Sequence, residues 1–223
     1  MRLNVTGREV ILKVVYYGPP LSGKTSNLKA LHGLLAPGCC GAMTSLDTQD
    51  DRTLFFDLLP VQIETASGYS IKLQLFTVPG QAIHASTRRL VLTGADGIVF
   101  VADSQIAEAR RNSEYWLGMR QYLKDSNLDP ATIPTVVQFN KRDLPNVRTD
   151  SDLATMRQRA PYPIVSAIAV QSVGVLETLA AVLKAMFVDL DQRHGFQDKF
   201  QITWEVLIEK PFPKGFRLSQ ESA

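Results

Sequence analysis

Short apolar runs alternate with longer stretches of helical spacing along this chain of 223 residues. A short apolar run bounded by turn residues predicts a buried strand, and apolar residues recurring every three or four positions predict a helix. Strands that alternate with helices predict an α/β fold with a mostly parallel central sheet and helices on both faces. The expected strands cover residues 10–17, 53–65, 70–78, 97–102, 133–139 and 163–167.

Helical spacing follows most of these strands. The last helical stretch carries Leu179, Leu183 and Leu190, and Gly195 marks its expected end because glycine is favoured just beyond a helix C-terminus. We therefore expect a domain of residues 1–194 and a C-terminal extension of residues 195–223. The other expected helices contain residues 28–35, 88–92 and 115–123.

The extension has a period-two pattern of its own. Apolar and polar side chains alternate over residues 200–208, which is typical of a half-buried strand, and Leu207 is the one position that breaks the alternation. We expect an extra strand here that packs on its own domain. The competing interpretation is that residues 200–209 pair with a sheet edge of a partner or of a second copy.

The most informative stretch lies between the first strand and the first helix, where residues 18–25 read GPPLSGKT. It fits G-x-x-x-x-G-K-[ST], in which backbone N–H groups surround phosphates, the lysine reaches the terminal phosphate and the last hydroxyl holds Mg²⁺. A helix directly after the loop adds partial positive charge at its N-terminus. The stretch predicts a nucleoside phosphate site in which Lys24 contacts phosphate and Thr25 holds the metal.

A second motif indicates which base is bound. Asn140, Lys141 and Asp143 form N-K-x-D after the expected strand 133–139. A carboxylate placed like Asp143 accepts the N–H donors on the edge of guanine, whereas adenine would leave it unpaired, which is costly. At the ligand-facing end of a strand, downstream of a phosphate loop, this motif favours GTP and GDP over ATP. A P-loop kinase that binds ATP would leave it unexplained.

Hydrolysis of GTP needs a positioned water and positive charge near the γ-phosphate. Gln81 follows a strand-ending Pro-Gly pair and can orient a water, because its amide donates and accepts at once. Arg52 can supply the charge, with a solvated loop arginine as the alternative. Thr53 offers a hydroxyl to Mg²⁺ or to the γ-phosphate, unless it is an ordinary threonine at the start of a strand.

Several strings together resemble one family. They are YYGP at 16–19, RTLFFDLLP at 52–60, TVPGQ at 77–81, VFVADS at 99–104 and NKRDLPNV at 140–147. Over about residues 8–193 the chain is similar to the bacterial MglA-type small GTPases, which are Ras-like switches of gliding motility and cell polarity. The resemblance implies a Ras-like P-loop GTPase fold that uses GTP/GDP and Mg²⁺, with Arg52 as an internal arginine finger, Gln81 positioning the water and Thr53 as the switch threonine.

The resemblance further implies a partner, a Roadblock-domain (MglB-like) activating protein that orders the loops around 37–53 and 79–95 without inserting an arginine.

Two positions lower the rate of hydrolysis that we expect. Most Ras-like proteins have Asp where Thr77 stands, and a neutral hydroxyl holds Mg²⁺ less well. Pro20 stands where the family has Gly, and proline has no N–H to donate. We expect modest Mg²⁺ affinity and slow hydrolysis without a partner. The second hypothesis is a catalytically weak guanine-nucleotide-binding scaffold that acts through its C-terminal extension.

Ser166-Ala167 resembles the S-A-K string of the Ras pattern, but counting back from Gly174 places Ile168-Ala169-Val170 in register with it. The resemblance therefore favours the Ala169 N–H as the contact to the guanine carbonyl. The predicted catalytic residues are Arg52, Gln81 and Lys24, and the predicted metal ligands are Thr25 and Thr53. The predicted nucleotide-binding residues are Gly18, Leu21, Ser22, Gly23, Lys24, Thr25, Ser26, Thr53, Gly80, Asn140, Lys141, Asp143 and Ala169.

Composition adds few constraints. The chain is 45% hydrophobic and 21% charged with a formal net charge of +2, which argues against nucleic acid as a partner and against a polybasic membrane anchor. The N-terminus has no signal-peptide core and no myristoylation glycine, so we expect a cytoplasmic protein without a direct membrane anchor. Cys39 and Cys40 are adjacent and are expected to be free thiols.

Overall fold

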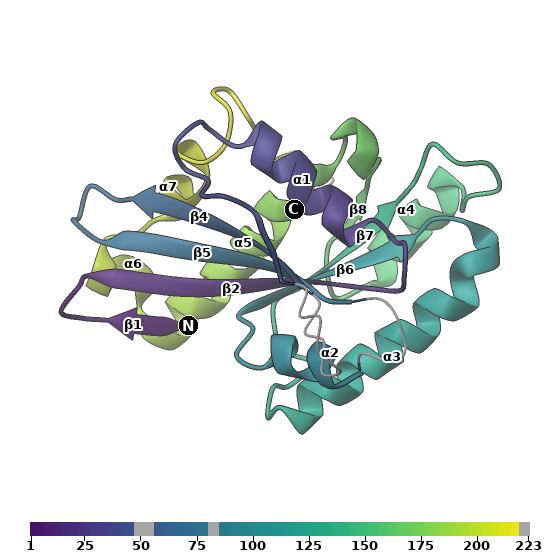
Figure 1. The fold of residues 1–223 in the computed structure, drawn as a ribbon, viewed down its shortest axis with the longest axis horizontal. Helices are drawn as coiled ribbons and strands as arrows, with labels where there is room; N and C mark the ends of the chain where they lie inside the picture. Colours follow the sequence, from purple (N-terminus) through teal and green to yellow (C-terminus); the bar gives the residue numbers. More distant parts are fainter. Residues whose placement is uncertain (47–55, 80–84, 219–223) are drawn as a thin grey trace.

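The computed structural model describes residues 1–46, 56–79 and 85–218. In these ranges a single eight-stranded sheet runs in the order β3-β4-β5-β2-β6-β7-β8, with β1 beside β2 (Figure 1). Pairing is parallel from β5 through β8 and antiparallel for β1–β2, β3–β4 and β4–β5. The strands are β1 Arg2–Asn4, β2 Glu9–Tyr17, β3 Thr44–Leu46, β4 Phe56–Glu64, β5 Ser70–Thr77, β6 Gly97–Asp103, β7 Thr135–Asn140 and β8 Ile164–Ser166.

Helices cover both faces of this sheet, so the predicted α/β architecture with a mostly parallel sheet is confirmed. The α-helices are α1 Lys24–Leu34, α2 Ala85–Leu92, α3 Ala109–Asp125, α4 Asp150–Arg159, α5 Val175–His194, α6 Phe196–Phe200 and α7 Trp204–Glu209. The described ranges also contain the short 3₁₀ helices η2 Ile106–Glu108 and η3 Ala169–Gln171. Among the described residues, none of these helices is both long and apolar enough to span a membrane.

The central strand β2 divides the interior into two cores, because neighbouring side chains of a strand point to opposite faces. Val14 and Tyr16 belong to the core that includes residues of α1, α5 and the C-terminal extension. Val15 and Tyr17 belong to the core that includes residues of α2, α3 and α4. All four side chains are buried, which explains why the sequence of β2 reads as nearly continuous apolar residues.

Most predicted boundaries match the structure to within a few residues. The expected hairpin is confirmed as β4 paired antiparallel with β5, and α5 ends at Gly195, whose φ of 63° is left-handed. Several elements were not predicted, among them β1, β3 and α4. Strand β1 consists of three exposed residues and has no apolar periodicity to read. Helix α4 fully buries only Leu153, although Thr149 and Asp152 form a capping box at its start.

The prediction of an extra strand over residues 200–209 is wrong. This stretch forms the end of α6 and then α7, separated by Gln201, whose φ of 53° is left-handed. The position that broke the alternation, Leu207, is the one fully buried residue of α7. Trp204 and Leu207 are three positions apart and face the core together, as helical spacing requires. Because the segment is helical, the competing interpretation that it pairs as a strand with a sheet edge of a partner or of a second copy is also wrong.

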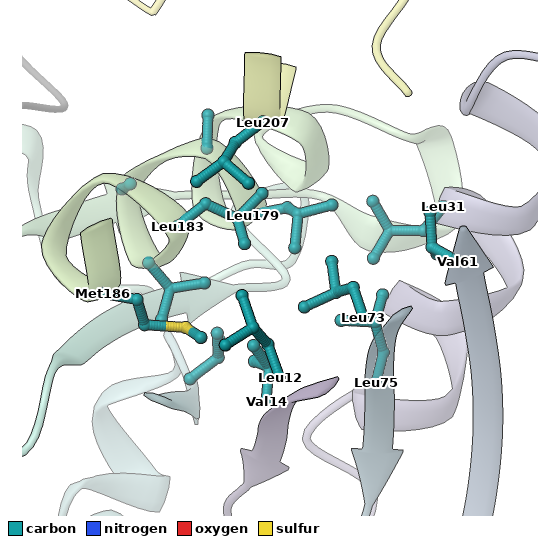
Figure 2. Packing of buried hydrophobic residues seen from close by; sticks show 14 of the residues in the cluster. Leu12, Val14, Leu31, Val61, Leu73, Leu75, Leu179, Leu183, Met186 and Leu207 are labelled. Atoms are coloured by element: carbon teal, nitrogen blue, oxygen red, sulfur yellow. The ribbon is translucent and has the colours of Figure 1, made fainter. Parts of the chain in front are cut away.

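The extension nevertheless packs on its own chain, as the preferred interpretation stated. Phe196, Ile202 and Leu207 are buried in the same core as β2 and α5. Figure 2 shows Leu207 directed at the α5 side chains Leu179 and Leu183. Beyond α7, the carbonyl oxygen of Pro211 accepts a 2.8 Å hydrogen bond from the backbone of Ala36, just after α1.

Candidate phosphate and base site

The predicted binding residues gather where parallel strands end. β2, β6 and β7 run in the same direction, so their carboxyl ends lie at one edge of the sheet. The phosphate loop (residues 18–25) follows β2, and Asn140 is the last residue of β7. The loop that leads from β8 into η3, residues 167–169 and here called the base loop, lies at the same edge. Three stretches far apart in sequence therefore meet at this edge, which is where open α/β sheets bind their ligands and is here called the crevice.

Gly23 shows how tightly this crevice is built. It precedes α1 with a left-handed φ of 100°, and a Cβ there would lie 2.1 Å from the Asn140 Nδ2 atom. Only glycine fits such a position. Helix α1 then begins at Lys24, so its N-terminus opens toward the crevice with unpaired N–H groups. Proline at position 20 offers no such group.

Lys24 is buried behind the phosphate loop. Its Nζ donates to the carbonyl oxygens of Gly18 at 3.0 Å and Pro19 at 2.7 Å. The pKa of Lys24 is lowered to about 7, first by burial and then by the positive charge of Arg88 on α2, while the negative charge of Asp57 acts in the opposite sense. A phosphate group would be a stronger partner than two carbonyls, because both members of the pair are charged.

The other predicted residues of the loop lie at its surface or behind it. Leu21 is 86% exposed and has a left-handed φ of 60°, an uncommon backbone conformation for leucine. Ser22 is buried, and its hydroxyl has no hydrogen-bond partner in the described part of the chain. Thr25 is exposed and Ser26 half-buried at the start of α1.

A carboxylate to which the sequence analysis gave no role lies beside Thr25. The Thr25 hydroxyl donates to Asp57 Oδ2 at 2.6 Å, and the Thr77 hydroxyl donates to the same oxygen at 3.0 Å. Ser45, paired with Asp57 in the sheet, donates to Oδ1 at 2.7 Å. Asp57 thus lies opposite Thr77 on the neighbouring strand, continuing the register from the Leu58–Phe76 pair. It supplies the negative charge that Thr77 lacks.

The role of Asp57 could have been inferred from the sequence. Asp57 is a lone carboxylate at the start of an apolar strand, and it lies where an antiparallel neighbour would bring it next to Thr77. Within the described ranges, no group of three or more His, Cys, Asp or Glu side chains could hold a metal ion by itself. The Thr25 hydroxyl and the Asp57 carboxylate are hard oxygen donors of the type Mg²⁺ prefers, and a phosphate would complete such a site.

At the base end, Asn140 joins two loops. Its Nδ2 donates to the Ser22 carbonyl at 2.8 Å, and its Oδ1 accepts from the Ala169 N–H at 2.9 Å. The predicted contact from Ala169 to a guanine carbonyl stays a prediction, and it would share this amide with Asn140. Lys141 has a left-handed φ of 65° and pairs with Asp103 at 2.5 Å.

Asp143 is exposed, and it makes no hydrogen bond to any residue that the structure describes. Its carboxylate is therefore available to a ligand.

Four predicted residues, Arg52, Thr53, Gly80 and Gln81, lie outside the described residues.

Comparison with known proteins agrees with this geometry. Residues 12–186 match the ADP-ribosylation factor family. The chain is also 42% identical over 188 residues to the mutual gliding-motility protein MglA of Myxococcus xanthus (strain DK1622), an alignment that covers 84% of this chain and 96% of the relative. This chain is an MglA-type member of the ADP-ribosylation factor family of Ras-like GTPases. The resemblance read from the motifs is thereby confirmed.

Membership in this GTPase family indicates the general chemistry of the site, which is binding of guanine nucleotides and hydrolysis of GTP. Arf-type GTPases bind guanine nucleotides and hydrolyse GTP, which fits the phosphate loop and the N-K-x-D motif of this chain. The family match ends at residue 186, so α6 and α7 lie beyond it.

Proposed function

We propose that this protein binds GTP and GDP with Mg²⁺, hydrolyses GTP slowly on its own, and switches conformation with the state of the nucleotide. Residues 1–194 form the GTPase domain of this proposal, and residues 195–223 form an extension packed on it. The single observation that carries the proposal is the Asn140 side chain. Because it is bonded to Ser22 and Ala169 together, it sets the phosphate loop and the base loop side by side, with the exposed Asp143 three residues further along the chain.

The described residues divide the work of binding. Lys24 and the phosphate-loop amides hold the phosphates, while Asp143 accepts the N–H donors of guanine. The Thr25 hydroxyl and Asp57, acting through water, hold Mg²⁺. When bound, this ion neutralises charge on the phosphate oxygens. We therefore revise the expected metal site: Asp57 contributes the carboxylate that position 77 lacks.

Hydrolysis rests on residues whose roles come from the family resemblance. In this proposal Gln81 orients the attacking water, Arg52 places positive charge at the γ-phosphate, and Thr53 senses that phosphate. Pro20 removes one N–H from the loop that would stabilise the same charge. Hydrolysis without a partner is slow for this reason.

The relative's printed name concerns gliding motility, and we propose a related role in motility or cell polarity for this chain. We also propose a Roadblock-domain (MglB-like) protein as the activating partner, which orders the loops that carry Arg52 and Gln81. In this proposal the partner stimulates hydrolysis without inserting an arginine of its own.

The first test is the nucleotide that copurifies with the protein. Nucleotide released by denaturation is separated by anion-exchange chromatography, which gives both the base and the number of phosphates. We expect GDP, or GDP mixed with GTP. An adenine nucleotide would refute the proposal.

The second test is single-turnover hydrolysis of bound GTP with Mg²⁺, with and without a Roadblock-domain partner. We expect slow hydrolysis that the partner accelerates. Tight GTP binding with no turnover in either condition would instead support the catalytically weak scaffold, whereas fast hydrolysis without a partner would contradict the assigned effect of Pro20.

A further inference from the structure

A chain of buried polar side chains runs beneath the nucleotide crevice, in the core between β7, α1 and α5. Asn27, Gln138 and Thr178 are each fully buried, with no exposed side-chain surface. They come from α1, β7 and α5, three elements that are far apart in sequence. Polar groups at such depth are costly unless they are all hydrogen-bonded, so their arrangement needs an explanation.

The two amides face each other as a reciprocal pair. Asn27 Nδ2 donates to Gln138 Oε1 at 2.8 Å, and Gln138 Nε2 donates to Asn27 Oδ1 at 2.8 Å. Gln138 Nε2 uses its second hydrogen on Thr178 Oγ1 at 2.9 Å. Asn27 Nδ2 uses its second hydrogen on the carbonyl oxygen of Gly23 at 3.0 Å. Every N–H of both amides is therefore donated.

The chain ends on a backbone carbonyl at each side of the crevice. At one end is the Gly23 carbonyl of the phosphate loop. At the other, the Thr178 hydroxyl donates to the Gly174 carbonyl at 2.6 Å. Gly174 packs directly against the base loop, since a Cβ there would lie 2.8 Å from the Cα atom of Ala167. One continuous set of hydrogen bonds thus runs from the phosphate loop to Gly174, and the packing of Gly174 on Ala167 completes the link to the base loop.

These end points bear on ligand geometry. A trans peptide is planar, so holding the Gly23 carbonyl also fixes the direction of the Lys24 N–H on the other side of that peptide bond. That N–H lies in the first turn of α1 and faces the crevice, where a phosphate would accept it. Holding Gly174 in turn fixes where the base loop begins its return into α5.

We propose that Asn27, Gln138 and Thr178 are positioning residues that hold the phosphate loop and the base loop at the separation a guanine nucleotide spans. The proposal rests on the proposed nucleotide-binding function and adds a second connection between the two loops to the one that the buried Asn140 makes. A ligand that touches both loops depends on this connection. A ligand that touches only the phosphate loop depends on the contact from Asn27 to the Gly23 carbonyl, but not on the link that Gln138 and Thr178 make to the other loop.

The test compares two ligands that differ in this respect. Dissociation constants are measured for GDP and for inorganic pyrophosphate, both with Mg²⁺, on the full chain. Gln138→Met removes the central amide, and we expect GDP affinity to fall about tenfold, the effect of one lost buried hydrogen bond, with pyrophosphate affinity changed by less than about twofold. Thr178→Val should act in the same direction, whereas Thr178→Ser keeps the hydroxyl and should restore GDP affinity.

A double variant separates positioning from plain stability. In Asn27→Leu/Gln138→Met both amides become apolar, so no buried polar group is left unpaired and thermal stability of the nucleotide-free protein should approach that of the parent. We expect GDP affinity to stay weak even so. The matched control is Thr135→Val on the same strand, which removes the 2.9 Å hydrogen bond from Thr135 to the Ile133 carbonyl and should leave both affinities unchanged.

The outcomes distinguish failure of the positioning role from failure of the proposed nucleotide-binding function. If GDP affinity recovers together with thermal stability in the double variant, or if pyrophosphate and GDP weaken equally, the three residues serve stability alone and the inference fails. If all variants bind GDP like the parent, it fails as well. A parent protein that binds pyrophosphate but no GDP would refute the proposed function itself, and the inference with it.

Discussion

The two ends of the crevice are built in different ways. At the base end, the loops are held by side chains with little or no exposed surface, including Asn140, Asn27 and Gln138. At the metal end, Asp57 accepts from the buried Thr77 and from Thr25 and Ser45, which are both exposed. Buried hydrogen bonds exchange slowly with water and fix a geometry, whereas exposed ones are easily replaced. In the proposed function, base recognition therefore rests on the core, and the exposed contacts of the metal end are the ones that respond to the nucleotide.

The largest expected effect tests the phosphate loop that both ends share. Lys24→Met removes the buried charge, and we expect GDP affinity to fall about 100-fold because a charge-assisted contact to phosphate is lost. Thermal stability of the nucleotide-free protein should not fall, since a buried ammonium group carries a desolvation cost. Isothermal titration and thermal denaturation measure the two quantities. A parallel loss of affinity and stability would mean that Lys24 is mainly a structural residue.

The next effect is a pH dependence at the same lysine. In the free protein the pKa of Lys24 is lowered to about 7, and a bound phosphate would raise it again. Binding then takes up a proton above pH 7, so the dissociation constant for GDP should rise with pH by up to about tenfold per pH unit and level off below pH 7. Titrations at several pH values measure this slope. Lys24→Met is the control and should abolish it.

A smaller effect should be confined to the metal end. Asp57→Asn keeps the shape of the side chain and removes its charge, so the Mg²⁺ concentration for half-maximal hydrolysis should rise about tenfold. GDP affinity measured with a chelator present should change by less than about twofold. Glu64→Gln, at the other end of the same strand, is the matched control. Equal weakening with and without Mg²⁺ would show that the two ends are not separable.

The smallest effect concerns the missing donor in the phosphate loop. Pro20→Gly restores a backbone N–H, and we expect single-turnover hydrolysis without a partner to rise about threefold while GDP affinity stays similar. Rapid-quench measurements on preloaded protein give the rate. A variant no faster than the parent would remove Pro20 as the cause of slow turnover.

The sequence located the phosphate loop and the N-K-x-D segment because short motifs carry them, and the binding roles of their residues stay predictions. Residues 18–25 and Asn140 to Asp143 are contiguous strings whose roles follow from local geometry. Asp57 was not predicted as a site residue because its proposed role depends on Thr77, a neighbour on another strand. Gln138 appeared only as one polar residue within an apolar run, and its partners lie 111 and 40 residues away.

Residues 200–209 show a different limit. Alternation over a short window fits a strand, yet in the described part of the chain this segment pairs with neither of the edge strands β3 and β8. The apolar side chains could be buried only against α5 and its neighbours, and helices achieve that with Leu207 at the centre. Tertiary packing therefore overrode the local pattern.

The packed extension also has a practical consequence for work with this protein. Phe196 and Leu207 are shielded by the same core that contains α5, so a version cut at residue 194 would leave that face of α5 open to water. Large exposed apolar patches promote self-association and precipitation. Domain boundaries drawn from the family match at residue 186 would remove this cover, and shortened versions designed for crystallisation or binding assays should instead retain the chain through Phe212.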